Sequence, residues 1–256
     1  TRAYVAKIRN PKTLAQMKNR LSMRNFAMIY RSLKPVLSQS FPNRPPKESG
    51  FNAFVKANKT VASAVVTKEG ALKGLCVPYD MAVSSGYLTQ FGVCNRYSLS
   101  SNDYIGFLLT GHPNLSAIIE LWSDEQSDKI DTQARLRAVW DVLQIPKNGV
   151  ITILWGTYQD EGYAVRSYRI TYNSTDEELA ALPGKFRRSS SATLGEPITD
   201  PALTIADVGN LEILASMIIS WVDADGKLQV TNSRMTSPVR TDDYALQFVE
   251  GGDVYA

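Results

Sequence analysis

The chain contains one histidine, His112, and this is the side chain whose ordinary pKa lies closest to neutral pH. It stands in Thr110-Gly111-His112-Pro113, where the following proline favours an extended or turn geometry. General acid–base or metal chemistry would need partner side chains that the neighbouring sequence does not supply. The motifs of a nucleophile elbow, a zinc protease, a phosphate-binding loop and a dinucleotide fold are missing from the sequence. We therefore expect a protein that is not an enzyme, uses no cofactor and has no small-molecule substrate.

Two further stretches have the composition of a site. Asp223-Ala224-Asp225-Gly226 alternates oxygen ligands before a glycine, but a calcium loop would place its first ligand at Trp221, which cannot coordinate. We predict a hairpin turn there and no metal site. Arg187 and Arg188 lie in a polar stretch, 183–202, which we interpret as an exposed contact loop.

Charge is distributed very unevenly along the chain. The first 47 residues carry eleven cations and no acidic residue, whereas the rest holds 17 cations and all 25 acidic residues, so a segment of +11 precedes a body of −8. Cations without intrahelical counter-charges repel one another, which favours neutralisation by an external surface. The predicted contact residues are Arg2, Lys7, Arg9, Lys12, Lys18, Arg20, Arg24, Arg31, Lys34, Arg44, Arg187 and Arg188, with Asp242 and Asp243 in the acidic tail.

Several surfaces could neutralise these cations. We favour the acidic surface of a neighbouring copy, with nucleic acid as the next alternative and plain solvent after it. The nucleic-acid reading lacks an accompanying recognition motif. The sequence has no apolar run of 18 residues, so we expect no membrane partner.

The elements that must position these residues divide into helical and β segments. Asn10-Pro11 predicts the start of an amphipathic helix that Pro35 interrupts, and a second helix is predicted from about Phe51 to Ser63, capped by Ser49. The two would form an antiparallel helical hairpin.

Beyond residue 70 the pattern changes to β-branched and aromatic residues between turn residues. We predict strands at Met81–Val83, Gly86–Val93, Asp103–Leu109, Val150–Tyr158, Tyr163–Tyr172, Leu211–Val222 and Lys227–Thr236, with helices at 112–148 and Thr175–Leu182. The predicted fold class is α+β, with a basic helical segment (1–70), a β-sandwich domain (71–240) interrupted by the helical insertion 112–148, and an acidic tail (241–256). Cys76 and Cys94 are expected to be unpaired, buried thiols, with a single disulfide as the alternative.

Short motifs at both ends of the chain resemble an uncharacterised domain family of gut Bacteroidetes and their crAss-like phages. Asn10-Pro11-Lys12-Thr13-Leu14-Ala15-Gln16 is similar to its N-P-[RK]-T-x-A-Q signature, and Ser49–Phe54 is similar to its F-N-A motif. Val83–Leu88 resembles a V-S-x-G-x-L element, and Trp221–Ser233 resembles the closing D-G-K-x-[VS]-x-N-S hairpin. Region 112–148 departs from the usual pattern. The resemblance implies helices followed by an immunoglobulin-like β-sandwich, and it implies no known activity.

Charge, predicted fold and resemblance together suggest a structural role. We expect a phage virion protein, made in the cytoplasm of the bacterial host, that forms a ring or part of a tail. It would be a homo-oligomer in contact with other virion proteins, built by head-to-tail contact of the basic helix with an acidic surface. The alternatives are a nucleic-acid-associated protein and a cell-surface adhesion module.

Overall fold

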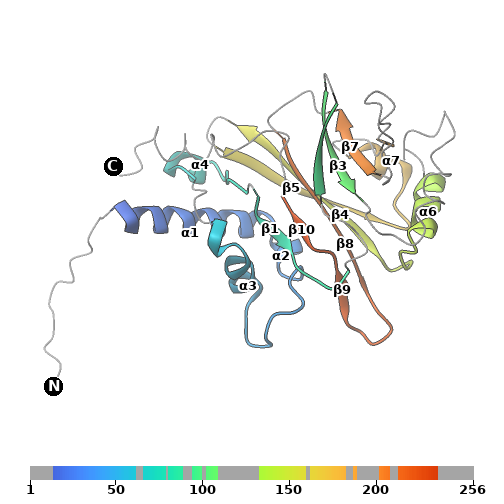
Figure 1. Cartoon of the computed structure of the whole chain (residues 1–256), viewed down its shortest axis with the longest axis horizontal. Helices are drawn as coiled ribbons and strands as arrows, with labels where there is room; N and C mark the ends of the chain where they lie inside the picture. The colour runs from blue at the N-terminus through green and yellow to red at the C-terminus, as the bar shows by residue number, and fades with distance from the viewer. Residues whose placement is uncertain are drawn as a thin grey trace, which may run out of the picture.

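The computed structural model describes residues 14–61, 66–78, 80–88, 94–99, 102–108, 133–159, 162–182, 187–188, 202–207 and 213–235. Within these ranges helices accompany antiparallel sheets, and strands dominate beyond residue 80 (Figure 1). The α+β class predicted from the sequence is confirmed at this level. None of the helices in the described ranges is long and apolar enough to cross a membrane.

The first described segment is helical. It comprises α1 (Leu14–Ser32), α2 (Lys34–Leu37), α3 (Gly50–Ala57), the 3₁₀ turn η1 (Lys59–Val61) and α4 (Lys68–Leu72). Pro35 lies in the first turn of α2 and has no backbone N–H, so α1 cannot continue through it, as predicted. The Ser49 hydroxyl accepts a hydrogen bond from the Asn52 N–H and caps α3, which was also predicted. The predicted helix start at Asn10-Pro11 lies outside the described residues.

A four-stranded antiparallel sheet forms the centre of the described structure, in the order β5-β4-β8-β9. Its strands are β4 (Val150–Gln159), β5 (Gly162–Thr171), β8 (Ile213–Val222) and β9 (Leu228–Val230). Both hairpins predicted for these residues are confirmed, because β4 pairs with β5 over their full length and β8 pairs with β9. The long-range pair β4–β8 joins the two hairpins.

A second four-stranded antiparallel sheet has the order β2-β3-β7-β6, and a two-stranded sheet pairs β1 with β10. The strands are β1 (Ala82–Ser84), β2 (Cys94–Leu99), β3 (Asn102–Leu108), β6 (Arg187–Arg188), β7 (Ala202–Asp207) and β10 (Ser233–Arg234). The strands predicted at Met81–Val83 and Asp103–Leu109 correspond to β1 and β3. β2 was missed.

The strand predicted at Gly86–Val93 was wrong in its described part. Residues 86–88 form a single parallel bridge, between Leu88 and Thr231. A Cβ atom at Gly86 would collide with the Val230 carbonyl, so the glycine is needed for close approach of the two backbones. The described part of this stretch therefore contributes one bridge and not a strand.

One face of the central sheet packs against α6 (Gln133–Val142) and α7 (Asp176–Ala180). Alternate β4 residues, Ile151, Ile153 and Trp155, join the α6 side chain of Trp140 in one apolar cluster. The predicted stripe is buried at Leu136 and Trp140 of α6 and at Leu143, which directly follows the helix, and the indole N–H of Trp140 donates to the Pro146 carbonyl at 3.1 Å. α7 begins with the capping box of Thr175 and Glu178. The part of the predicted insertion at 112–132 lies outside the described residues.

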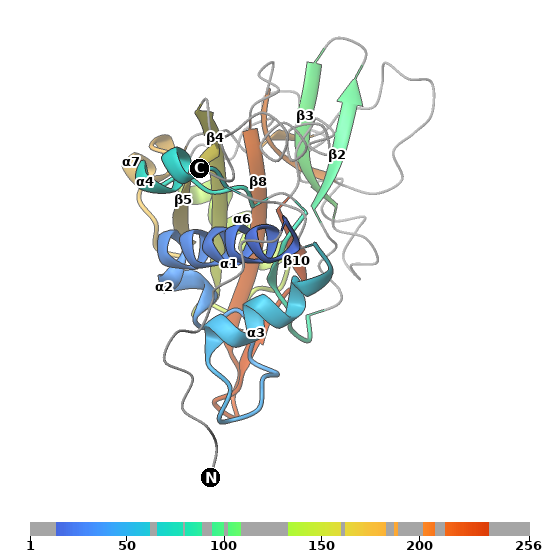
Figure 2. The same ribbon diagram turned by 90° about the vertical axis from the view of Figure 1, so that its left-hand side faces the viewer.

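The N-terminal helices cover the opposite face of the same sheet. Leu154, Leu214 and Ile218 share an apolar cluster with side chains from the helical segment: Leu21, Phe26, Ile29, Leu33, Leu37, Phe41 and Phe54. Phe54 is fully buried and packs edge-on against Phe26, with ring centroids 5.8 Å apart. Figure 2 shows α1, α2 and α3 lying across this face in front of the strands.

Two fully buried asparagines fasten this helical layer to extended backbone. Asn25 of α1 donates to the Val77 carbonyl at 3.0 Å and accepts from the Val77 N–H at 2.8 Å. Asn58, directly after α3, makes the same pair of bonds to Ala82 of β1, at 2.9 and 2.7 Å, and also donates to the Phe54 carbonyl. Each amide thus replaces a missing strand partner. Asn58 also explains why α3 ends before the predicted Ser63.

Cys76 lies next to Val77 and is a free, fully buried thiol, as expected from the sequence. Its backbone forms a bridge with Tyr163 of β5. Burial disfavours the charged thiolate and raises the pKa of Cys76 to about 12. For Cys94 the structure describes the backbone alone.

Replacing Asn25 with leucine should lower the free energy of unfolding by about 2–5 kcal/mol, because two buried backbone groups of Val77 lose their partners. Asn19→Leu makes the same change at an exposed position of α1 and should alter stability by no more than about 0.5 kcal/mol. Urea denaturation of both variants measures the difference. Equal decreases in the free energy of unfolding for the two variants would show that the hydrogen bonds of Asn25 to Val77 do not stabilise the fold.

Cys76 should make stability fall with rising pH above its unfolded pKa of 9.0. The folded thiol stays protonated up to a pKa of about 12, so between these values the unfolded chain binds fewer protons and is favoured. From pH 8 to pH 10 wild type should lose about 1.4 kcal/mol more than Cys76→Ala, measured by urea denaturation. Identical pH dependence in the two proteins would contradict this.

Candidate interaction surface

α1 carries the predicted arginines on the face opposite its buried side chains. Arg20, Arg24 and Arg31 are exposed, whereas Leu21, Phe26, Ile29 and Leu33 are buried. Spacings of four and seven residues place the arginines on one side of the helix. Arg24 and Arg31 are about 10 Å apart along the helix axis. The amphipathic arrangement predicted from the sequence is therefore present in α1.

The arginine face of α1, defined by Arg20, Arg24 and Arg31, has few counter-charges nearby. α1 contains no acidic residue. The guanidinium groups of Arg24 and Arg31 make no hydrogen bond or ion pair with the part of the chain that the structure describes, whereas Arg20 does interact with another residue. Arg31 lies in the last helical turn, where the helix dipole favours a cation. The helix is thus held in place while the charges of Arg24 and Arg31 stay available to a partner.

The other predicted contact residues are distributed differently. Lys34 is exposed at the start of α2, next to the arginine face. Arg44 is half-buried and donates to the Phe41 carbonyl at 3.0 Å, so it stabilises the proline-rich turn. Lys18 is in α1, and Arg187 and Arg188 form β6, opposite Thr204 and Leu203. Arg2, Lys7, Arg9, Lys12, Asp242 and Asp243 lie outside the described residues, as does His112.

Asp223 organises the hairpin turn between β8 and β9. One carboxylate oxygen accepts from the N–H groups of Asp225 and Lys227, at 3.0 and 2.8 Å, and the other accepts from the Gln229 amide at 2.6 Å. The Gln229 hydrogen bond is the main cause that lowers the pKa of Asp223. Gly226, with φ of +76°, completes the turn. The predicted turn is confirmed, and no acidic, histidine or cysteine cluster suited to a metal occurs among the described residues.

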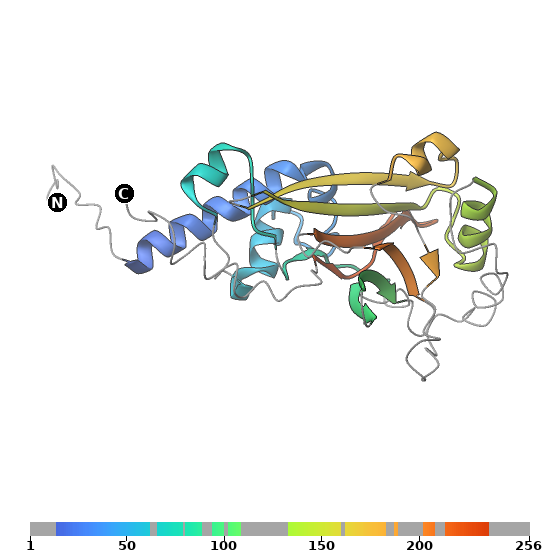
Figure 3. The same ribbon diagram turned by 90° about the horizontal axis from the view of Figure 1, so that it is seen from above.

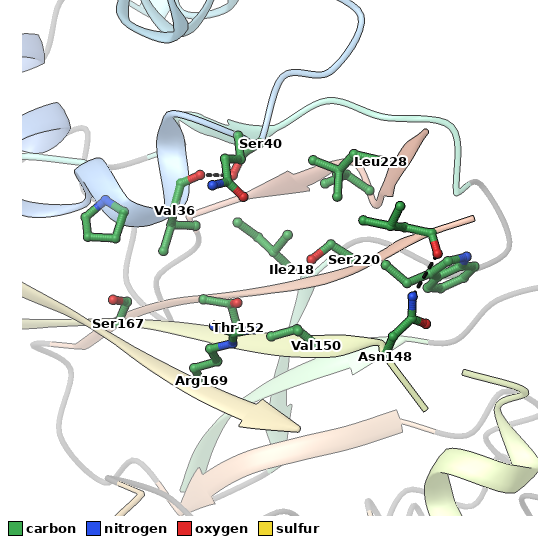
Figure 4. A pocket seen from close by; sticks show the side chains of 15 residues that line it. Val36, Ser40, Asn148, Val150, Thr152, Ser167, Arg169, Ile218, Ser220 and Leu228 are labelled. Carbon is green, nitrogen blue, oxygen red and sulfur yellow. Dashed lines mark hydrogen bonds between the residues drawn. The ribbon is translucent and has the colours of Figure 1, made fainter. Parts of the chain in front are cut away.

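A pocket of about 360 Å³ lies between α2 and the central sheet, on the same face as the N-terminal helices (Figure 4). α2 and the residues after it form one wall, and all four strands contribute to the floor. The lining residues are Pro35, Val36, Gln39, Ser40, Asn148, Val150, Thr152, Ser167, Arg169, Ile218, Ser220, Trp221, Val222, Leu228 and Val230. None of these fifteen is a carboxylate, a histidine or a thiol. The pocket is suited to binding an apolar group beside a cation.

Some polar groups of this pocket are already engaged within the protein. The Asn148 amide donates to the Val222 carbonyl at 2.8 Å, and the Ser40 hydroxyl donates to the Val36 carbonyl at 2.8 Å. The exposed Arg169 guanidinium has no hydrogen bond or ion pair with the described part of the chain. Sequence reasoning missed this pocket. The signal in the sequence was the polar run of β5, because an interior strand of a sheet is usually apolar and such a run indicates an edge strand.

Comparison with known proteins gives no relative. No family model, no curated protein and no solved structure matches this chain. The function must therefore be inferred from the surfaces that the chain itself presents.

Proposed function

We propose that this chain is a non-enzymatic structural protein that assembles with copies of itself through the arginine face of α1. The observation that carries the proposal is the pair Arg24 and Arg31, exposed and without an ion-pair partner in the described chain, on a helix whose other face is fixed in the core. A fixed helix loses little conformational freedom when it binds. Its charges can therefore contribute to association.

Acidic side chains lie at the opposite end of the described structure. Asp141 of α6 and Glu177 of α7 are exposed, and neither carboxylate has an ion pair within the described ranges. Figures 1 and 3 place α1 at one end of the central sheet and α6 and α7 at the other. A contact between the arginine face of one copy and this acidic end of the next is head-to-tail. Such a contact generates a ring when its rotation closes.

The resemblance to a domain family of gut Bacteroidetes and their phages extends the proposal to a virion subunit that forms a ring or part of a tail. The immunoglobulin-like sandwich and the helical hairpin belong to the same proposal. The two four-stranded antiparallel sheets support the first, and the contacts between α1 and α3 support the second. The localisation that follows is the virion, after synthesis in the host cytoplasm.

Reversing Arg24 and Arg31 should abolish self-association at low salt, because the face would then repel the acidic end of the next copy. R24E/R31E should sediment as a monomer under conditions in which wild type forms multimers. K56E/K59E is the matched control, since it makes the same charge change at two exposed lysines. Lys56 lies in the last turn of α3, and Lys59 lies just after that helix. Multimers of R24E/R31E like those of wild type would contradict the proposal.

A mixture of two variants tests which surfaces meet. D141K/E177K reverses the acidic end and should also be monomeric alone. Mixed with R24E/R31E, it should form alternating multimers, because both kinds of contact then join opposite charges. Monomers in the mixture would show that Asp141 and Glu177 are not the partner surface.

Nucleic acid is the alternative partner for the same arginines. A wild-type protein that stays monomeric but binds duplex DNA at about 50 mM salt, with affinity falling steeply as salt rises, would replace the assembly proposal. R24E/R31E should then weaken binding to all DNA sequences alike.

A further inference from the structure

β5 is the outer strand of the central sheet, as Figure 3 shows, and among the described residues its outer edge is closed at two points. Near its start, Tyr163 exchanges hydrogen bonds with Cys76, at 3.0 and 2.7 Å. At its end, the Thr171 N–H donates to the Ser174 hydroxyl and the Thr171 carbonyl accepts from the Ser174 N–H, both at 3.0 Å. Between these closures the described structure places no strand beside β5.

Hydrogen bonding alternates along an antiparallel strand, so the residues with outward backbone groups follow from Tyr163 and Thr171. They are Val165, Ser167 and Arg169, and each directs one N–H and one carbonyl away from β4. None of these six groups has a partner in the described part of the chain. An unpaired edge of this length is a template for another strand.

Charge limits which strand can pair there. Arg166 and Arg169 are exposed on β5, and β4 contains no acidic residue. Pairing of two β5 edges would bring arginines of both copies together, which is unfavourable. The edge therefore favours an acidic strand.

The pocket beside α2 adjoins this edge. Ser167 and Arg169 belong both to the open edge and to the pocket lining, and Val36 and Ile218 supply apolar surface within it (Figure 4). Strand addition of this kind takes affinity from backbone hydrogen bonds and specificity from pockets for alternate side chains. The edge supplies unpaired backbone groups, and the pocket supplies space for side chains, so together they have both parts of such a site.

We propose that the open edge of β5 binds the acidic C-terminal segment of a second copy, residues 241–250, as an added strand. This segment contains Asp242, Asp243 and Glu250, and its two aromatic residues and its leucine, Tyr244, Leu246 and Phe248, stand at alternate positions and share one face of a strand. Antiparallel pairing with Leu246 opposite Ser167 places Tyr244 opposite Arg169 and Phe248 opposite Val165. The side chains of Tyr244, Leu246 and Phe248 then lie on the pocket face. The side chain of Asp242, which stands opposite Thr171, lies on the same face, diagonally across from Arg169.

This inference rests on the proposed self-assembly but uses a different surface, so the two can fail separately. The direct experiment measures binding of a fluorescent peptide of residues 241–251 to full-length chain carrying D242K/D243K, whose own tail is disabled. Hydrogen exchange is followed on the same complex. The amides of Val165, Ser167 and Arg169 should become protected, while those of Ala164 and Tyr168, already bonded to β4, should not change.

Three variants of the receptor sharpen the result. S167P removes one outward N–H without touching the β4 ladder and should weaken peptide binding at least about tenfold. S167V keeps that N–H and should bind within about twofold of the parent. R166E/R169E should weaken binding several-fold, most at low salt, and it keeps the test valid if S167P is unstable.

Absence of binding, equal binding of a scrambled peptide, or binding without protection of the three amides would overturn the proposal. Protection of these amides in dilute, monomeric wild type would also overturn it, because the tail would then occupy its own edge. Peptide binding with protection of the three amides, together with multimers of R24E/R31E like those of wild type, would sink only the proposal that the arginine face makes the contact. Multimers that form with the three amides unprotected would sink only the strand-addition proposal.

Discussion

The position of the helical layer depends on one kind of directional interaction, the pairing of a buried asparagine amide with the backbone of an extended segment. Asn25 and Asn58 both do this, and each satisfies an N–H and a carbonyl that would otherwise be buried without partners. Apolar packing alone is non-directional and would allow the helices to slide over the sheet. The two amides set the position of α1 and α3, and Phe54 fills the space between them.

That placement has an electrostatic consequence. A helix with three exposed arginines and no acidic residue is a poor helix by itself, since its charges repel and it lacks stabilising pairs. Burial of its apolar face offsets that repulsion and leaves the arginines on a fixed surface. Asp141 and Glu177 are exposed carboxylates on α6 and α7, at the other end of the sheet. Such a molecule is suited to head-to-tail contact with itself.

Local patterns in the sequence predicted the elements that depend on neighbouring residues. The β4–β5 hairpin follows from two runs rich in β-branched and aromatic residues around a short polar turn, and α7 follows from Thr175 and Glu178 at capping-box spacing. The break at Pro35 and the buried stripe of α6 also came from local rules.

What the sequence did not predict depends on pairings between distant segments. The order of the sheets is set by contacts such as β4 with β8, some sixty residues apart, which no short pattern encodes. In the sequence Asn25 is an ordinary polar residue of a helix, and its structural role depends on the position of Val77, to which it is hydrogen-bonded. The pocket and the open edge of β5 were missed for the same reason, because the pocket forms where α2 meets the sheet and the edge follows from the strand order. The arginine face was found because helical spacing alone defines it.

The most direct test of the account is the mass of the native wild-type assembly at two salt concentrations. Because the contact joins exposed charges, native mass spectrometry in about 50 mM ammonium acetate should show one discrete multiple of the 28.3 kDa chain. Raising the salt to about 500 mM should convert that species to monomer. A protein that is monomeric at both concentrations, or a multimer whose mass is unaffected by salt, would contradict assembly through the arginine face.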